Sequence, residues 1–199
     1  KQELLAFRQG ELDMIFRIPT EMHGQILSEF KDAKGGNTPF VLQMVPAMSL
    51  TYYGFQNQGK VFNNKKVRQA FNYAIDRDKI ITNILKGEGI AGKYGMVPPV
   101  DNFSAKGYEF EKLKGYSFEP DMARKLLAEA GFPNGKGFPS VTLQINSGGA
   151  DRNVLTAQLI QSQLKEVGIT MGIVITPNTG TDFYQLVKEP MTYSQSRPG

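Results

Sequence analysis

The stretch that decides the fold is VTLQI (141–145), followed by DRNVLTAQLIQSQLKEV (151–167) and MGIVIT (171–176). The first and last segments are short, apolar and rich in β-branched residues, which is typical of buried strands. The longer segment between them has apolar residues at helical spacing and ends before Gly168, a residue type common after helix ends. The order strand, helix, strand predicts an α/β sheet with helices packed on its faces.

The rest of the chain continues this alternation of helices and strands. Pro19–Thr20, Asn63 or Asn64, Asp76 and Glu119–Pro120 are suitable helix starts, and glycines follow the expected helices at 35–36, 87 and 131. A further short helix is expected at 182–187. Strands are expected at 12–16, 40–44, 50–57 and from 191 to 193, and residues 87–117 are expected to form an irregular loop.

The composition indicates a folded chain of one domain or two small ones. It has 199 residues, of which 40% are hydrophobic and 21% charged, so it is neither a disordered chain nor a membrane-spanning one. No apolar run approaches the roughly 20 residues that a membrane span needs. The formal net charge is only +4 and the basic residues are scattered, so we predict no nucleic-acid partner.

The residue types exclude several kinds of active site. The chain has no cysteine, which rules out disulfides, thiolate zinc sites and cysteine nucleophiles. Its one histidine, His23, lies in an expected helix between Met22 and Gly24, where a structural or solvent-facing role is favoured. We therefore predict no catalytic residue, no metal site and no cofactor.

Two motifs that resemble functional sites have simpler interpretations. GEGIAG (87–92) matches the glycine pattern of a dinucleotide-binding loop, but an expected helix precedes it where that site requires a strand. A helix end followed by a turn is the preferred interpretation. Asp76 and Asp78 form a carboxylate pair at an expected helix start, where capping is the preferred role.

Polar residues follow the expected strands of the second half. Asn146 to Arg152 come after one strand, and Ser194 to Gly199 come after another. Ligands of open α/β sheets bind beyond the carboxyl ends of the strands. Arg197 is the residue type that holds a carboxylate through charge-assisted hydrogen bonds, so these two loops are the candidate ligand site.

Five stretches resemble one protein family, in the order in which that family carries them. The stretches are LAFRQGELD (5–13), FNNKKVRQAFNYAIDRDKI (62–80), MVPP (96–99), DMARKLLAEAGFP (121–133) and IQSQLKEVGI (160–169). Together they resemble the extracytoplasmic solute-binding proteins of peptide/nickel-type ABC importers. The second stretch is the most specific of the five, and the resemblance spans essentially the whole chain.

The resemblance implies an architecture larger than this chain. Members of the family are longer and have two lobes around a cleft, in the type II periplasmic-binding-protein arrangement. Residues 1–199 are then expected to be a single α/β lobe, with a mixed sheet flanked by helices, inserted in the middle of a longer protein whose other lobe is absent. Lys1 and Gly199 are expected to lie close together, near the hinge between the lobes.

The resemblance also implies a function and a set of site residues. The protein would capture peptides between its lobes and deliver them to the permease of an ABC importer, without catalysis. We expect a periplasmic or extracytoplasmic monomer, tethered to the membrane only if a preceding segment carries a lipid anchor. The ligand-binding residues are expected to be Arg197, Ser196, Gly199, Lys188, Asn146 and Arg152.

Other functions remain open from the sequence. Relatives of this family also bind nickel chelates, haem and oligosaccharides, so the same fold with a non-peptide ligand is the first alternative. An α/β enzyme is the second, although the chain offers no convergent acid/base set around His23. A nucleic-acid binder is the third, and Lys65–Lys66 is too small a basic cluster to favour it.

Overall fold

The structure is a computed structural model that describes residues 2–16, 18–32, 40–43, 49–59, 61–98, 109, 112–146 and 150–176. The helices are α1 (Gln2–Arg8), α2 (His23–Asp32), α3 (Lys65–Ala74), α4 (Arg77–Lys79), α6 (Pro120–Glu129) and α7 (Ala150–Glu166). Shorter turns of other helix types are η1 (Thr20–Met22), η2 (Ile80–Ile84) and η4 (Pro133–Gly135). The strands are β1 (Val141–Asn146) and β2 (Met171–Thr176). Within these residues no helix is long and apolar enough to cross a membrane.

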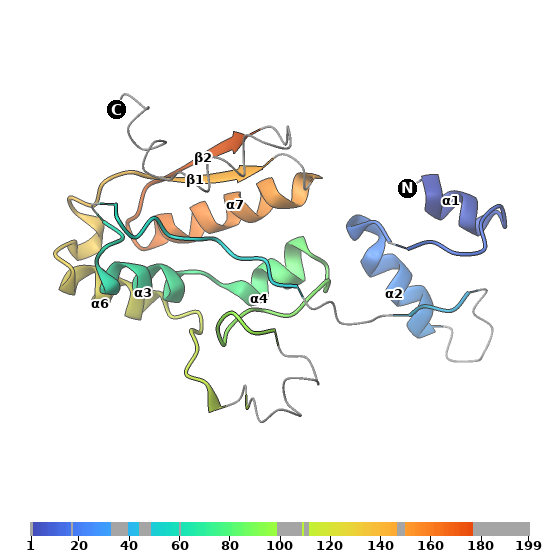
Figure 1. Cartoon of the computed structure of the whole chain (residues 1–199), viewed down its shortest axis with the longest axis horizontal. Coiled ribbons are helices and arrows are strands. Elements are labelled where there is room, and N and C mark those ends of the chain that lie inside the picture. Colours follow the sequence, from blue (N-terminus) through green and yellow to red (C-terminus); the bar gives the residue numbers. More distant parts are fainter. Residues whose placement is uncertain are drawn as a thin grey trace.

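The strand–helix–strand unit predicted for residues 141–176 is confirmed. β1 and β2 pair in parallel, with Val141 opposite Met171 and Asn146 opposite Thr176. Helix α7 returns the chain between them and lies along one face of the pair (Figure 1). Residues Ile160 and Leu164 of α7 are buried, because this face of the helix packs toward the sheet and the core.

Three predicted strands are wrong in the part of the chain that the structure describes. Residues 12–16, 40–43 and 50–57 have no strand partner there. Segment 12–16 is not buried either, since Met14 and Phe16 are 82% and 91% exposed. Branched and aromatic residues favour a strand only where a neighbouring strand accepts the backbone hydrogen bonds. The helix predicted at 182–187 and the strand from 191 lie outside the described residues.

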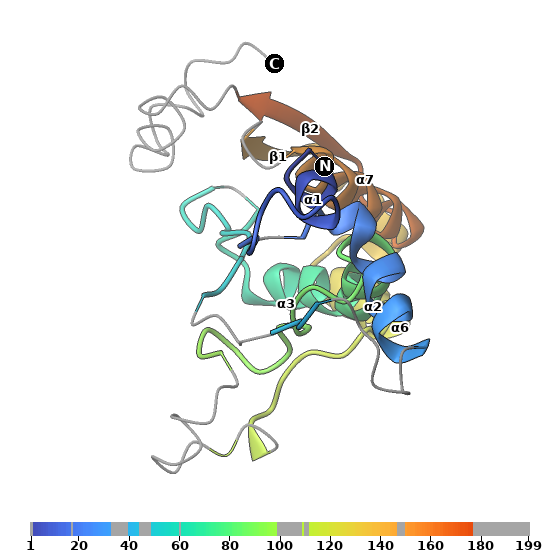
Figure 2. The ribbon, with the colours of Figure 1, turned by 90° about the vertical axis from the view of Figure 1, so that its right-hand side faces the viewer.

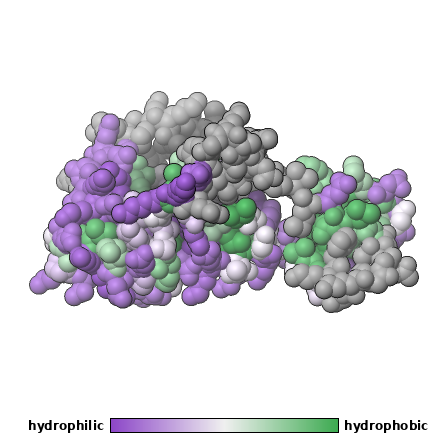
Figure 3. Space-filling view, turned by 90° about the horizontal axis from the view of Figure 1, so that it is seen from below, coloured by the Kyte–Doolittle hydropathy of each residue, from purple (hydrophilic) through white to green (hydrophobic). Residues whose placement is uncertain are grey.

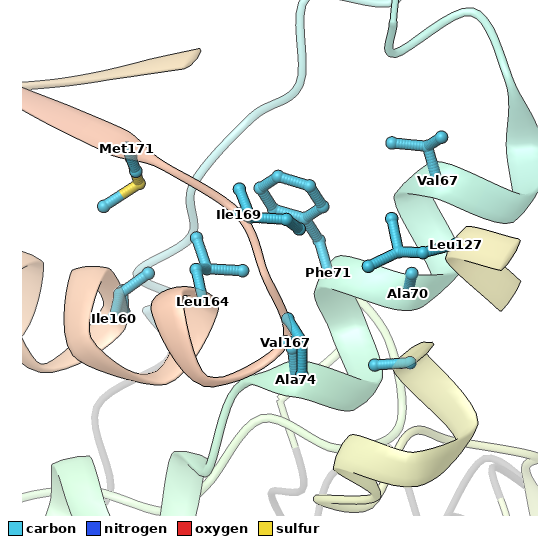
Figure 4. Close-up of a cluster of buried hydrophobic side chains, with 11 residues drawn as sticks. Val67, Ala70, Phe71, Ala74, Leu127, Ile160, Leu164, Val167, Ile169 and Met171 are labelled. Atoms are coloured by element: carbon cyan, nitrogen blue, oxygen red, sulfur yellow. The ribbon is translucent and has the colours of Figure 1, made fainter. Parts of the chain in front are cut away.

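The main core lies between α3, α6, α7 and the β2 side of the sheet (Figure 4). Phe71 of α3 is its central aromatic ring, 5.1 Å from the Phe62 ring and 5.7 Å from the Phe55 ring between centroids. The buried members of this cluster are Val67, Ala70, Phe71, Ala74, Ala123, Leu127, Ile160, Leu164, Val167, Ile169 and Met171. All come from residues 67–171, so the second half of the chain with α3 forms one packing unit.

The predicted ends of α3, α4 and α6 are confirmed. Asn64 Oδ1 accepts a hydrogen bond from the Lys66 amide at 2.9 Å, and Asp76 Oδ1 accepts one from the Lys79 amide at 3.0 Å. Helix α6 ends at Glu129 and is followed by Gly131, whose φ of 95° lies in the left-handed region, and the Phe132 amide then donates to the Leu127 carbonyl. These contacts satisfy backbone groups that a helix end leaves unpaired.

The Asn64 cap makes a testable contribution to stability. Replacing Asn64 with alanine is expected to lower the free energy of unfolding by about 1 kcal/mol, because the Lys66 amide loses its acceptor. Asn63→Ala is the matched control, since Asn64 and not Asn63 is the N-cap residue of α3. Urea denaturation of the two variants measures the difference, and equal losses would contradict the capping role.

The described residues 2–16, 18–32 and 40–43 form a second, smaller body. Arg8 of α1 donates to both carboxylate oxygens of Glu29 in α2, at 2.9 and 2.7 Å, and the Phe7 and Phe40 rings meet edge to face at 5.9 Å. Leu4 is buried in this body, as is Ile26. α1 and α2 lie together on one side of the molecule, beyond the α7 N-terminus and away from α3 and α6 (Figure 1). Viewed from that side, α1 lies in front of α7 (Figure 2).

Candidate functional site

The carboxyl ends of β1 and β2 carry a small set of hydrogen-bonded polar side chains. Gln144 Nε2 donates to Thr176 Oγ1 at 2.9 Å, which joins the two strands at this end. Asn153 Nδ2 donates to Asn146 Oδ1 at 3.1 Å, which ties the last residue of β1 to the first turns of α7. The side-chain amides of Gln144, Asn146 and Asn153 are therefore held in place by hydrogen bonds to other side chains. Each of these amides can still form further hydrogen bonds.

Arg152 adds a positive charge to this end of the sheet. Its Nη1 lies 3.4 Å from both carboxylate oxygens of Glu88, and the Thr20 hydroxyl donates to Glu88 Oε2 at 2.9 Å. The Arg152 and Glu88 side chains are 41% and 43% exposed, so water competes for both charges. A loose, half-exposed pair of this kind leaves the Arg152 guanidinium able to bind an anionic group as well.

The structure brings two of the six predicted ligand-binding residues to the same place. Asn146 ends β1, and Arg152 lies in the first turn of α7 beside Asn153, the hydrogen-bond partner of Asn146. Lys188, Ser196, Arg197 and Gly199 lie outside the described residues, as do both termini whose proximity was expected. The ligand-binding role of all six residues stays a prediction.

Glu88 is the residue of this region that sequence reasoning missed. It is separated from Arg152 by 64 residues and from Thr20 by 68, so no local pattern connects the three side chains. Its own neighbourhood indicates only a turn, because Gly87 and Gly89 both have positive φ. Only the path of the chain after η2 places this carboxylate next to α7.

Residues 62–80 are the most specific of the five stretches that resemble the family, and several of their charged side chains have structural roles. Arg68 Nη1 donates to the Phe62 carbonyl at 2.6 Å, and Arg77 Nη2 donates to Asn72 Oδ1 at 2.7 Å. Burial lowers the pKa of Arg77 from its usual value. Asp76 caps α4, and its own amide donates to Gln163 Oε1 of α7 at 3.1 Å. The stretch thus holds α3, α4 and α7 together.

The other motifs that resemble functional sites in the sequence have structural roles in the fold. GEGIAG (87–92) follows the helical turn η2 and opens no helix, as predicted. Lys93 Nζ forms a salt bridge with Asp78 Oδ2 at 2.7 Å, and this hydrogen-bonded contact raises the pKa of Lys93. Among the described residues no three His, Cys, Asp or Glu side chains come together as a metal site.

An open depression of about 540 Å³ lies at the start of α6, lined in part by Phe118, Asp121 and Lys125. Helix α6 is at the other end of the main body from the carboxyl ends of the strands (Figure 1). The depression is therefore separate from the site that contains Asn146 and Arg152.

Comparison with known proteins identifies the family. Residues 1–195 match the family described as bacterial extracellular solute-binding proteins, family 5 Middle. The chain belongs to this family. Among curated relatives, the glutathione-binding protein GsiB of Escherichia coli is 32% identical over 160 residues, which are 80% of this chain and 28% of the relative. Heme-binding protein A of Haemophilus influenzae is 35% identical over 88 residues, or 44% of this chain and 15% of the relative.

Solved structures show the corresponding fold. HbpA2 of Haemophilus parasuis matches 96% of this family 5 chain at a TM-score of 0.67 and 25% identity, and the chain covers 34% of it. The oligopeptide-binding protein AppA of Bacillus subtilis, in complex with a nonapeptide, matches 94% at a TM-score of 0.60 and 26% identity, with 35% of AppA covered. These are type II periplasmic binding proteins, so the predicted fold class is confirmed. The family 5 chain spans about a third or less of the length of these relatives.

Proposed function

We propose that this chain is part of the ligand-capturing subunit of an ABC importer, which binds peptides between two lobes and delivers them to the membrane permease. The family match over residues 1–195 is the observation that carries the proposal. The 1–199 segment contributes one lobe, and the rest of the longer protein contributes the other. The subunit is an extracytoplasmic monomer, and a lipid anchor would hold it near the permease.

The physical mechanism uses backbone hydrogen bonds and charges at the ligand's ends. The side chains at the carboxyl ends of β1 and β2 offer amide groups (Asn146 and Gln144) and one half-exposed cation, Arg152. Such groups bind a carboxylate and peptide amides without forming or breaking a covalent bond. Bridging waters let a site of this kind accept many side chains. Closure of the lobes around the ligand creates the form that a permease distinguishes from the empty one.

A non-peptide solute is the second candidate ligand. Solved structures similar to this chain include NikZ of Campylobacter jejuni in complex with Ni(L-His) and AgaA of Agrobacterium tumefaciens in complex with agropinic acid. Heme-binding protein A of Haemophilus influenzae adds a further kind of ligand. A peptide is favoured because the chain also resembles AppA in complex with a nonapeptide, and a dipeptide-binding protein in complex with Met-Leu.

We propose that the subunit has no catalytic activity. The family is a solute-binding one. Of the residues that resemble catalytic groups, Asp76 caps a helix and Asp78 binds Lys93. A test for hydrolysis of bound peptides over many hours addresses this part of the proposal, because a binding protein returns its ligand intact.

Arg197 provides a specific test of the peptide site. In the longer protein, Arg197→Ala is expected to weaken the binding of a peptide with a free carboxylate by about 1.5–3 kcal/mol, the contribution of a charge-assisted hydrogen bond. A peptide with an amidated C-terminus should bind both forms equally. Arg124→Ala is the matched control, because Arg124 pairs with Asp121 on α6 at 2.5 Å, away from the strand ends. Isothermal titration calorimetry measures all six affinities, those of the unsubstituted protein and the two variants for the two peptides, and an unchanged affinity of Arg197→Ala for the free acid removes Arg197 from the site.

The identity of the ligand is best tested on the longer protein as purified. Native mass spectrometry, followed by identification of the released small molecules, is expected to yield a series of short peptides. A single non-peptide species would keep the family assignment and overturn the peptide ligand. Recovery of a nickel chelate or a haem would point to the second candidate directly.

A further inference from the structure

The Arg152 guanidinium is held less tightly than the other arginines in the part of the chain that the structure describes. Its two contacts, from Nη1 to the carboxylate oxygens of Glu88, are both 3.4 Å long. Charge-assisted hydrogen bonds between such groups are usually shorter than about 3 Å. The other described arginines each make a contact of 2.7 Å or less: Arg8, Arg68, Arg77 and Arg124. Arg152 is therefore the arginine whose partner is most easily exchanged.

Glu88 has a second partner, which is closer to it than Arg152. The Thr20 hydroxyl donates to Glu88 Oε2 at 2.9 Å. Thr20 belongs to the smaller body and Arg152 to the main body, and the two bodies lie side by side (Figure 3). Because the hydrogen bond from Thr20 does not involve the guanidinium, it can hold the carboxylate in place when the guanidinium binds another anion. Glu88 is then not left without a donor when it gives up Arg152.

A ligand at the carboxyl ends of the strands would reach this charged pair. Asn153, the residue after Arg152, is hydrogen-bonded to Asn146 at the end of β1. Among the described residues, Nη1 is the only nitrogen of the Arg152 guanidinium with a hydrogen-bond partner, so Nε and Nη2 can still donate. A carboxylate arriving there competes with Glu88 for the guanidinium. A neutral group does not compete, and leaves the pair intact.

We propose that Glu88 is an exchangeable counterion of Arg152 and, in this way, a specificity-determining residue of the ligand site. A ligand that places a carboxylate at Arg152 displaces Glu88, which stays bound to Thr20. A ligand with a neutral group at this point leaves Glu88 on Arg152, so the guanidinium keeps an anionic partner when the ligand covers it. Covering an unpaired charge is costly, and Glu88 removes this cost for neutral ligands. This role rests on the proposed function, because it requires a ligand at the strand ends.

Calorimetric titration of the longer protein with trialanine and with trialanine amide tests the exchange. Glu88→Gln removes the negative charge and keeps an oxygen that accepts from Thr20. The variant is expected to increase the preference for the free acid over the amide by roughly two- to fivefold, the range of a half-exposed ion pair. Glu129→Gln is the matched control, because it makes the same charge change in the Lys66–Glu129 pair, at the α6 end of the main body. It should leave the preference unchanged.

An Arg152→Gln background separates exchange from a general effect of charge. Without the guanidinium there is nothing for Glu88 to neutralise, so adding Glu88→Gln should no longer change the preference between acid and amide. A preference that Glu88→Gln alone does not change overturns the proposal. So does the same increase in the presence and absence of Arg152, because Glu88 then acts only through its own charge.

Acetate gives a second readout that needs no peptide. In the longer protein labelled with ¹⁵N-arginine, the Nε resonance of Arg152 is identified by its loss in Arg152→Gln. Acetate is expected to shift this resonance at a roughly two- to fivefold lower concentration in Glu88→Gln than in the unsubstituted protein, and acetamide should not shift it. If neither peptide binds but acetate behaves in this way, the proposed peptide ligand is wrong and the exchange is supported. An identical acetate response in the two forms overturns the exchange.

Discussion

Replacing Leu164 with alanine is expected to lower the free energy of unfolding by about 2–5 kcal/mol. Leu164 lies on the inner face of α7 with no exposed surface, and in the close-up of the core it points from α7 toward Phe71 and Ile169 (Figure 4). Alanine removes apolar atoms that nothing else can reach, and leaves a cavity whose lining loses its contacts. Because the site joins the helix to α3 and to the start of β2, the loss should affect the whole main body.

The control for this prediction lies on the same helix. Leu155 is 48% exposed, so Leu155→Ala makes the same chemical change and the same change in helix propensity without creating a cavity. Its expected cost is below about 1 kcal/mol. Urea denaturation followed by circular dichroism measures both variants. If Leu164→Ala lowered the free energy of unfolding no more than Leu155→Ala does, the packing of α7 described above would be wrong.

Gly168→Ala is expected to have an effect of similar size for a different reason. Gly168 follows α7 with a φ of 88°, a conformation that costs an alanine about 1–2 kcal/mol. A Cβ at this position would also overlap the carbonyl oxygen of Asn134, in the turn before β1. Relieving that overlap means moving backbone, which costs about 1–3 kcal/mol more. The total expected loss is roughly 2–5 kcal/mol.

Gly131→Ala separates the cost of the left-handed backbone conformation from the cost of the steric overlap. Gly131 has a φ of 95°, yet a Cβ built there meets nothing within 4 Å. It should therefore show only the conformational cost of about 1–2 kcal/mol. The difference between the two variants, measured by urea denaturation, reports the close approach of the turn after α7 to the turn after α6. Equal losses would mean that this approach is not part of the folded state.

Local sequence patterns were sufficient to predict helix ends and buried helix faces, because the contacts that stabilise these features are local. Asn64 and Asp76 each accept a backbone hydrogen bond from two or three residues ahead, and Gly131 ends α6 with an αL turn. The apolar spacing of α3 predicted its buried face, including Val67 and Phe71. These interactions depend on residues within one or two helical turns, so the amino-acid order carries them directly.

The strands expected at 12–16, 40–44 and 50–57 show the opposite case. Their composition is that of strands, but in the described part of the chain no second strand accepts their hydrogen bonds. Met14 and Val41, which composition places in a core, are largely exposed. Whether a branched or aromatic residue is buried depends on what the rest of the protein brings to it, and this is not encoded near the residue itself.

For this protein the sequence by itself determined the family, the strand–helix–strand unit of residues 141–176, and the capping residues at the starts of α3 and α4 and the end of α6. It also directed attention to the carboxyl ends of the strands, where Asn146 and Arg152 lie on adjoining elements. Only the tertiary structure placed Glu88 between Thr20 and Arg152, and only it divided the described residues into two bodies. The physical reason is that caps and helix faces arise from contacts between near neighbours. Charge pairs and shared cores join residues far apart in sequence, and the folded path of the chain decides which of them meet.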